Sequence, residues 1–367
     1  MTASERRWWR IPEARMKPLT LLLRRSGVVL ATMTATALGF AFPPSAGAQG
    51  VSKVGTTAAD FLQIGVGARA TAMGGAFVAV SDDAASLYWN PAGLAQIAGS
   101  EVIAAHSEWL ADVNFDYVGF TMSLGNAGNI GVSVTMLAMP EMLVRTEDRQ
   151  EGTGETFDAS DLAVGVSYGR AVTDRFNVGA TVKFVQQRIW HSSASGFAVD
   201  LGTQFRTDFF GGLTIGAAVF NFGTDLKLDG RDLRIFVDPD PLQLGNNSRI
   251  PANYELESFD LPLNFQFGVT SRPINSRMHR LTLSADALHP SSNYESVNVG
   301  FEYGYQGRVF LRGGFQSLLL DENEGGVAGG VGVHQQLFGG SFAKLDYAYR
   351  AVGRLGGIHV IGLGLTF

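Results

Sequence analysis

The chain has 367 residues, of which 46 are glycine and none is cysteine, and its formal net charge is −6. Without cysteine there is no disulfide framework, no thiolate metal site and no cysteine nucleophile. The negative charge argues against a nucleic-acid partner, because proteins that bind nucleic acids carry basic patches for the phosphate backbone. Outside the N-terminus, no apolar run reaches the roughly 18 residues that a membrane-spanning helix needs.

The N-terminus predicts an export signal over residues 1–48. Two arginines precede an apolar core at residues 27–42, and the small residues Ala-Gly-Ala at 46–48 fit a cleavage site. Met16 is the expected true start, because it opens a signal peptide of more ordinary length. The alternative is a transmembrane anchor, which the shortness of the apolar core disfavours.

A helix–break–helix unit is predicted over residues 81–97, inside an N-terminal region at 49–99. Aspartates can cap the first short helix, and Asn90 ends it because the residue before a proline is pushed out of the α region. The expected motif residues of this unit are Asp83, Tyr88, Trp89, Asn90, Pro91, Ala92 and Gly93.

From about residue 100 onward, the dominant period of the sequence is two. Apolar residues at 197, 199 and 201 alternate with smaller or polar ones such as Asp200, which predicts strands with one apolar and one polar face. We predict about fourteen strands, at residues 101–109, 115–124, 129–139, 161–171, 176–190, 197–206, 213–222, 263–271, 279–288, 296–304, 308–317, 326–335, 341–350 and 357–367.

Alternation alone does not separate a soluble β-sandwich from an outer-membrane barrel, but the connections do. Short turns alternate with connections that include two long loops, at 140–160 and 223–262, as in a bacterial barrel with short periplasmic turns. The last strand ends on Phe367, the aromatic residue that typically signals outer-membrane assembly. The sequence therefore predicts an antiparallel transmembrane β-barrel of about fourteen strands over residues 100–367.

A barrel of this size is wider than its own side chains can fill. We therefore expect residues 49–99 to approach from the periplasmic side and form a hatch, or plug, in the lumen, with Leu87, Tyr88 and Trp89 against the wall. Glycines are expected at inward positions where the contents press close. Inward charges are expected to pair with one another or with the hatch; they are Lys183, Asp200, Arg206, Asp286, Glu302, Lys344, Asp346 and Arg350.

One stretch resembles an enzyme motif without its structural context, and the histidines match no metal-binding motif. Residues 165–169 read GVSYG, but Ser167 falls in mid-strand, whereas the hydrolase motif needs a strand-to-helix elbow. The six histidines include no H-E-x-x-H motif and no pair four residues apart. The sequence therefore predicts no catalytic residues, no metal site and no cofactor.

Residues 61–97, FLQIGVGARATAMGGAFVAVSDDAASLYWNPAGLAQI, resemble the N-terminal signature of the PorV/PorQ family, a branch of the FadL-like outer-membrane barrels. Residues 284–315 resemble the second recurring block of that family. The resemblance implies fourteen strands and an N-terminal hatch that carries Asn-Pro-Ala, here residues 90–92. It also implies location in the outer membrane of a Gram-negative cell, in contact with lipid and with the outer-membrane assembly machinery.

The resemblance implies two alternative functions. The first is a shuttle or accessory component of type IX secretion, with secreted cargo proteins and surface secretion components as partners. The second is a FadL-like channel that passes hydrophobic small molecules. The apolar stretch LRIFV at residues 233–237, inside the longest loop, suits either the docking of a protein or the capture of an apolar ligand.

Overall fold

The computed structural model describes residues 54–209, 212–240, 242, 249–320 and 326–367. The predicted signal peptide lies outside the described residues. The described residues belong to one compact unit. Among them, no helix is long and apolar enough to cross a membrane.

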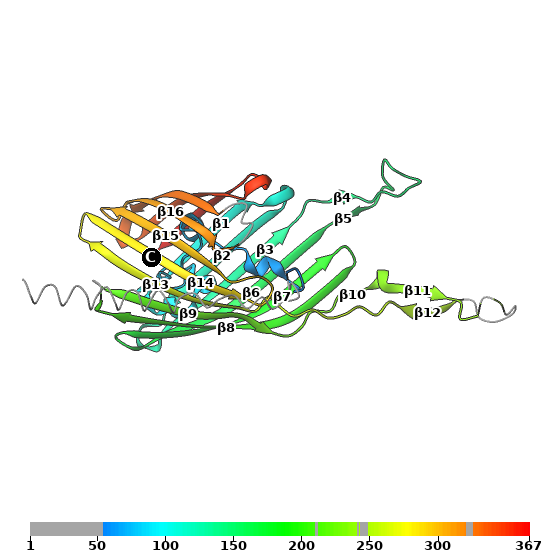
Figure 1. Ribbon diagram of the computed structural model, residues 1–367, viewed down its shortest axis with the longest axis horizontal. Helices are drawn as coiled ribbons and strands as arrows, with labels where there is room; N and C mark the ends of the chain where they lie inside the picture. The colour runs from blue at the N-terminus through cyan, green and yellow to red at the C-terminus, as the bar shows by residue number, and fades with distance from the viewer. Residues whose placement is uncertain (1–53, 210–211, 241, 243–248, 321–325) are drawn as a thin grey trace, which may run out of the picture. The chain divides into compact units, whose positions relative to one another are not determined.

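Fourteen long strands form a closed antiparallel barrel (Figure 1). Each strand pairs with its neighbours along the chain, and the first strand closes the ring by pairing with the last, with Glu101 opposite Thr366. The prediction of the barrel and of its strand number is confirmed. The strands are β1 (Glu101–Glu108), β2 (Asn114–Ser123), β3 (Asn129–Ala138), β6 (Ala159–Thr173), β7 (Phe176–Ile189), β8 (Ser192–Thr207), β9 (Leu213–Gly223), β13 (Asn264–Asn275), β14 (His279–Pro290), β15 (Ser296–Tyr305), β16 (Val309–Leu318), β17 (Val327–Gln336), β18 (Phe342–Ala351) and β19 (Gly357–Thr366).

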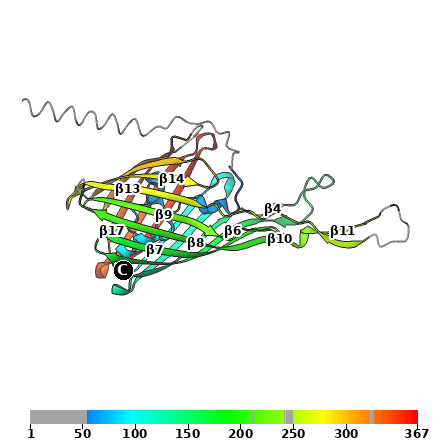
Figure 2. The same cartoon turned by 60° about the horizontal axis from the view of Figure 1, so that its bottom comes forward.

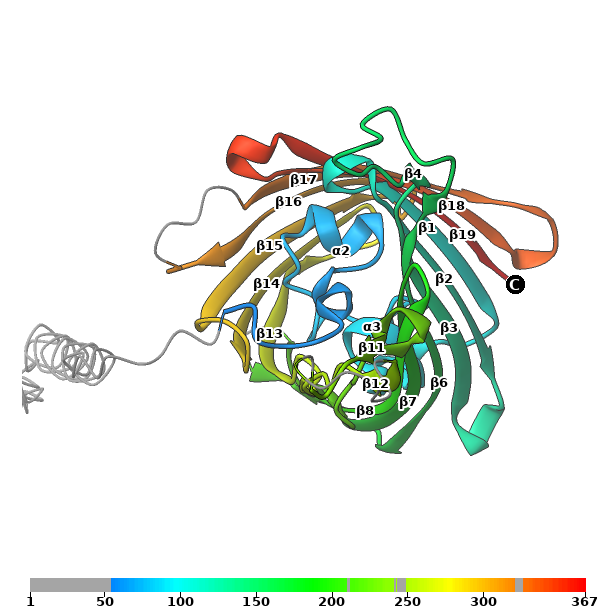
Figure 3. The same cartoon turned by 90° about the vertical axis from the view of Figure 1, so that its right-hand side faces the viewer.

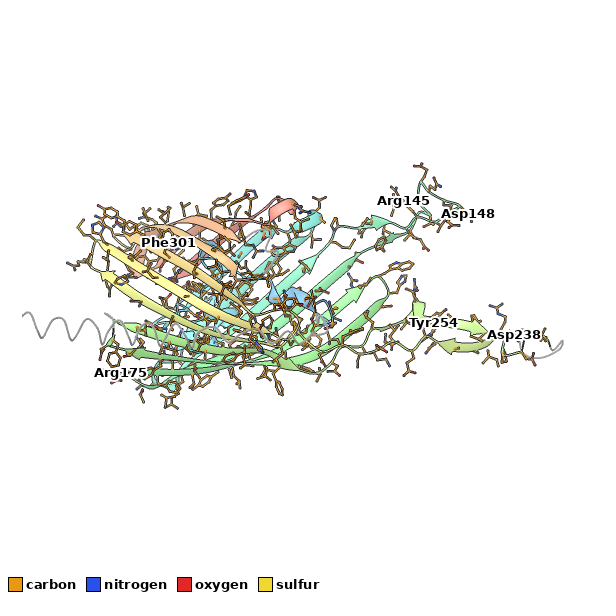
Figure 4. All side chains as sticks on the ribbon, viewed as in Figure 1. Arg145, Asp148, Arg175, Asp238, Tyr254 and Phe301 are labelled. Atoms are coloured by element: carbon orange, nitrogen blue, oxygen red, sulfur yellow. The ribbon has the colours of Figure 1, made fainter. Side chains whose placement is uncertain are left out.

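The outer face of the wall is apolar, as a surface in contact with lipid must be. On β2, Val118, Phe120 and Met122 are among the exposed positions, whereas Tyr117 and Thr121 point inward and are buried. Phe301 on β15, labelled in Figure 4, belongs to the same exposed apolar face. The period of two in the sequence thus separates a lipid-facing side from a lumen-facing side.

The two ends of the barrel differ in their connections. The two longest loops project from the same end, which we call the long-loop end (Figures 1 and 2). Arg175 lies in a tight turn at the opposite, short-turn end, far from Arg145 and Asp238 on the loops (Figure 4). The long loops contain short hairpins formed by β4 (Met142–Leu143) with β5 (Thr156–Phe157) and by β11 (Arg234–Val237) with β12 (Ile250–Asn253), and β10 (Asp229–Gly230) pairs with β8.

Residues 54–100, called here the N-terminal segment, lie inside the ring of strands (Figure 3). They contain η1 (Asp60–Gln63), α2 (Ala68–Ala72), α3 (Ser86–Trp89) and η2 (Pro91–Gln96). Other short helices of the described residues lie in connections between strands: η3 (Leu110–Asp112), η4 (Gly125–Ala127), η6 (Arg231–Leu233), η7 (Phe338–Gly340) and η8 (Gly353–Leu355).

The N-terminal segment runs through the lumen from one end to the other. The backbone N–H of Ala58 donates to the carbonyl of Asp260, at the base of the longest loop, over 2.9 Å. At its other end, Ser100 exchanges two backbone hydrogen bonds of 2.9 Å with Phe367 at the short-turn end. The expectation that the whole segment lies on the short-turn, periplasmic side is therefore wrong. Its first residues stay at the long-loop end because the apolar side chains of η1 pack against three inward alanines and one inward valine of β6, β7 and β8.

Candidate functional site

The break between α3 and η2 is held by one amide side chain. Asn90 is fully buried and its backbone is extended, with φ at −171°. Its Oδ1 accepts from the N–H of Ala92 over 3.1 Å, and its Nδ2 donates to the carbonyls of Val78 and of Thr203 on β8, over 2.9 and 3.1 Å. Since an amide offers both donors and an acceptor, Asn90 caps η2 and fastens the segment to the wall at once.

Glycines of the wall allow the backbone of η2 to come close. A Cβ atom added at Gly179 would collide with the backbone of Pro91, and one added at Gly202 would collide with Oδ1 of Asn90. These glycines are therefore required by close approach, and the prediction of inward glycines against the lumen contents is confirmed here. The glycines that face this part of the segment are Gly169 on β6, Gly179 on β7 and Gly202 on β8.

The aromatic pair of α3 holds the N-terminal segment together more than it grips the wall. The hydroxyl of Tyr88 donates to the carbonyl of Leu62 over 2.9 Å, and Nε1 of Trp89 donates to the carbonyl of Val66 over 3.0 Å. Buried tyrosine and tryptophan need partners for their polar atoms, and the folded-back segment supplies them. Leu87 packs directly against inward glycines of β2 and β3. Of the three residues expected at the wall, Leu87 therefore makes the most direct contact with the strands.

Arg69 of α2 joins the segment to the wall by ion pairs. Its guanidinium donates to both carboxylate oxygens of Glu302 on β15, over 2.8 and 2.9 Å, and to Asp82 and Asp83 over 2.6 and 2.7 Å. Burial opposes the charged state of Asp82, but Arg69 and Arg272 outweigh it and hold the pKa of Asp82 below its usual value. The bidentate geometry is the strong form of an arginine–carboxylate pair.

A second arginine continues this network along the wall. Arg312 on β16 is 2% exposed, and its Nε lies 2.7 Å from the same Glu302 carboxylate, while its Nη1 pairs with Asp346 on β18. Arg69 and Arg312 are absent from the residues expected from the sequence. Alternation would have found Arg312, because Val309 and Leu311 point outward and this register places position 312 inward.

The other inward charges are brought together in separate pairs. The ammonium of Lys183 on β7 lies 2.8 Å from Asp200 on β8, and Lys344 pairs with Glu101 next to the closing strand pair. Asp286 accepts from the backbone N–H of Val78 in the N-terminal segment, over 2.8 Å. The lumen charges therefore pair partly with one another and partly with the segment.

Two expected lumen charges have no ion pair within the described ranges. Arg206 lies exposed near the short-turn end of β8. Arg350 lies near the long-loop end of β18, where it donates to the amide oxygen of Gln316 over 2.8 Å and stacks over the ring of Trp109 at 5.0 Å. A neutral amide and an aromatic face surround this second guanidinium.

A cavity of about 170 Å³ lies in the lumen between the N-terminal segment and the wall. Its lining comes from η1 and α3 of the segment and from strands on both sides of the ring, including Lys183 on β7 and Arg350 on β18. Most of the other wall residues that line it carry amide or hydroxyl groups, namely Asn221, Asn264, Gln266, Ser296, Asn298, Gln316 and Ser317.

Ser167 and Phe367 take structural positions. The buried hydroxyl of Ser167 lies in mid-strand on β6 and shares a 2.7 Å hydrogen bond with the hydroxyl of Thr181, so no histidine activates it there. The side chain of Phe367 is exposed beyond β19. In the part of the chain that the structure describes, no group of three or more histidines, aspartates or glutamates could hold a metal ion.

Solved structures share the barrel at low sequence identity. The toluene transporter TbuX of Ralstonia pickettii is 15% identical, with a TM-score of 0.50, covering 82% of this chain and 97% of its own. The monoaromatic hydrocarbon channel CymD is 13% identical, with a TM-score of 0.53, covering 83% and 98%. The toluene transporter TodX of Pseudomonas putida is 13% identical, with a TM-score of 0.50, covering 82% and 97%. These likenesses establish the fold alone.

Curated proteins offer no match to this chain in a sequence search. The family model that matches is that of the type IX secretion system protein PorV, over residues 47–252. This range includes the N-terminal segment, the strands from β1 to β9 and most of the longest loop. Because the match spans more than half of its length, the chain belongs to the family of the type IX secretion system protein PorV.

Proposed function

We propose that this outer-membrane barrel is a non-enzymatic shuttle or accessory component of type IX-like protein secretion to the cell surface. The family match over residues 47–252 carries the proposal. In the proposal, secreted proteins or surface secretion components contact the long loops, and the N-terminal segment keeps the lumen closed. The barrel wall itself contacts lipid through its apolar outer face.

The hairpin of β11 and β12 is the surface that we propose for docking. It projects from the long-loop end, where Figure 4 labels Tyr254 and Asp238. It carries exposed apolar side chains, including Phe236 at 63% and Tyr254 at 60% exposure. Exposed apolar groups on a projecting hairpin are typical of protein–protein contact sites, and aromatic residues often dominate the energy of such contacts. The apolar stretch at 233–237 lies in this hairpin.

Closure of the lumen by the N-terminal segment fits the same role. Arg69, Asn90 and the glycine contacts fasten the segment to strands on opposite sides of the barrel. A secretion component that works through its outer loops has no need of an open channel, and an open one would leak. We therefore include the plug in the proposed function.

The polar lumen disfavours the alternative function, which is the passage of hydrophobic molecules. The neighbours named as toluene transporters share only the fold, and the cavity in this chain is lined largely by amides, hydroxyls and two cations. Apolar molecules gain little from such a lining, because its polar groups would lose their water without compensation.

Removal of the docking hairpin tests the proposal. Residues 231–256 would be replaced by a short glycine–serine linker, and surface delivery of secreted proteins would be compared with that of the unchanged protein. We expect a barrel that still shows heat-modifiable migration on gels, together with cargo that accumulates in the periplasm. The matched control shortens the β4–β5 hairpin by removing residues 144–155. Normal surface delivery combined with lost uptake of a hydrophobic compound would favour the channel instead.

A further inference from the structure

The cavity in the lumen combines positive charge with unsatisfied polar groups. Of the described residues that line it, none is an aspartate or glutamate, whereas Lys183 and Arg350 are cations. Lys183 is already balanced by Asp200, 2.8 Å away. Among the described residues, Arg350 meets the amide of Gln316 and the face of Trp109 and forms no ion pair. Among the described lining residues, the positive charge of Arg350 is therefore unbalanced.

A largely buried guanidinium without a counter-charge is costly, because the lumen replaces bulk water around it. An anion that enters the cavity would supply the missing charge. A carboxylate suits this position best, since its two oxygens match the planar fork of a guanidinium and form short, charge-assisted hydrogen bonds with it.

Strand β13, on another part of the wall, carries buried oxygens that need hydrogen-bond donors. Asn264 and Gln266 on β13 both line the cavity, and each has a buried side-chain oxygen without a hydrogen-bond partner in the described part of the chain. A buried oxygen without a donor loses stabilisation that water would give it. Hydroxyl groups of a ligand are donors that can reach such oxygens, while a purely apolar ligand offers none.

We propose that this cavity is a binding site for a small hydroxylated carboxylate, with the carboxylate at Arg350 and the hydroxyls toward Asn264 and Gln266. The volume of about 170 Å³ lies below the roughly 300–1,000 Å³ of ordinary small-molecule pockets. A sugar acid of one ring fits this scale, and a long acyl chain does not. The site goes beyond protein secretion and does not depend on it.

Calorimetric titration of the purified full barrel in detergent micelles tests the site, with glucuronate as the probe. Glucose is the neutral control with the same hydroxyls, and octanoate is the control with a carboxylate and an apolar chain. We expect saturable binding of glucuronate, and weaker or no binding of the two controls. Lack of saturable glucuronate binding, or equal or tighter binding of glucose or octanoate, would overturn the proposal without any variant.

Two arginine variants then locate the site. Arg350→Gln should weaken glucuronate binding by about tenfold or more, because a charge-assisted pair is lost. Arg206→Gln is the matched control, since it removes an exposed arginine that does not line the cavity. Heat-modifiable migration shows that each variant is folded. If Arg350→Gln fails to fold, Gln266→Leu replaces it, with a smaller expected loss of about threefold or more from one hydrogen bond. Unchanged affinity in the folded variant refutes the assignment.

Discussion

The two halves of the lumen are built on different principles. In the short-turn half, buried arginines meet carboxylates directly, as Arg69 and Arg312 both do with Glu302, and wall glycines let η2 touch the strands. In the long-loop half, space remains open, and Arg350 has only neutral partners within the described residues. The difference indicates that the short-turn half holds the segment in place, while the long-loop half leaves a cavity large enough for the small molecule that we propose.

The largest effect is expected from deleting residues 81–97, which removes α3 and η2 from the short-turn half. The barrel should still assemble, because its strands keep a closed hydrogen-bond ladder of their own. It should admit a large polar antibiotic that the intact protein excludes, which growth-inhibition assays would measure. Wild-type permeability together with lost partner binding would show that the segment is a docking handle and not a plug.

Arg69→Met tests whether the ion pairs of one arginine hold the N-terminal segment against the wall in the short-turn half. Removing one partner of a buried pair typically costs about 3–5 kcal/mol, because Glu302 would keep a buried charge with fewer partners. We expect the segment to become sensitive to added protease and the barrel to leak. Arg175→Met is the control, since Arg175 and Asp208 are 60% and 84% exposed and such pairs contribute roughly 0–1 kcal/mol. Equal protease resistance of both variants would contradict the structural role of Arg69.

Gly179→Val tests the close approach between β7 and η2. The new side chain would have to displace the backbone of Pro91, and overpacking of this kind costs about 1–3 kcal/mol. The guanidinium midpoint of unfolding in detergent should fall accordingly. Gly329→Ala on β17 is the matched control, because a Cβ there meets only one backbone oxygen, at 3.7 Å. A wild-type midpoint for Gly179→Val would mean that η2 does not press on this wall.

The smallest expected effect concerns the base of the longest loop, at the mouth of the long-loop half. A side-chain hydrogen bond with Asp260, followed by the charge of that residue, raises the pKa of Asp225 above its ordinary 3.8. An acid whose folded pKa is raised loses stability as pH rises through that pKa. Hydrogen exchange in the loop should therefore speed up modestly as the pH rises above about 4, beyond its intrinsic pH dependence. Asp225→Asn should remove this additional pH dependence of hydrogen exchange. If the variant keeps the pH profile of the unchanged protein, the hydrogen bond between Asp225 and Asp260 is not its cause.

Much of the wall is predictable from local pattern. The period of two gave all fourteen strands within a few residues, because each strand alternates between lipid and lumen regardless of its partners. The same alternation marks Asp200 and Arg312 as inward. It cannot say that Arg69 pairs with Glu302, since these residues are 233 positions apart and meet only when the segment is threaded through the closed barrel.

The sequence by itself determined the barrel, its strand number, the long loops and the Asn-Pro break at Asn90, because each depends on short-range periodicity or on backbone restrictions near proline. Only the tertiary structure decided that the N-terminal segment begins at the long-loop end and that Trp89 bonds to Val66. It also decided that Arg350 borders a cavity whose described lining residues include no carboxylate. These features depend on which distant groups the closed ring brings within hydrogen-bond distance, and no local pattern encodes those distances.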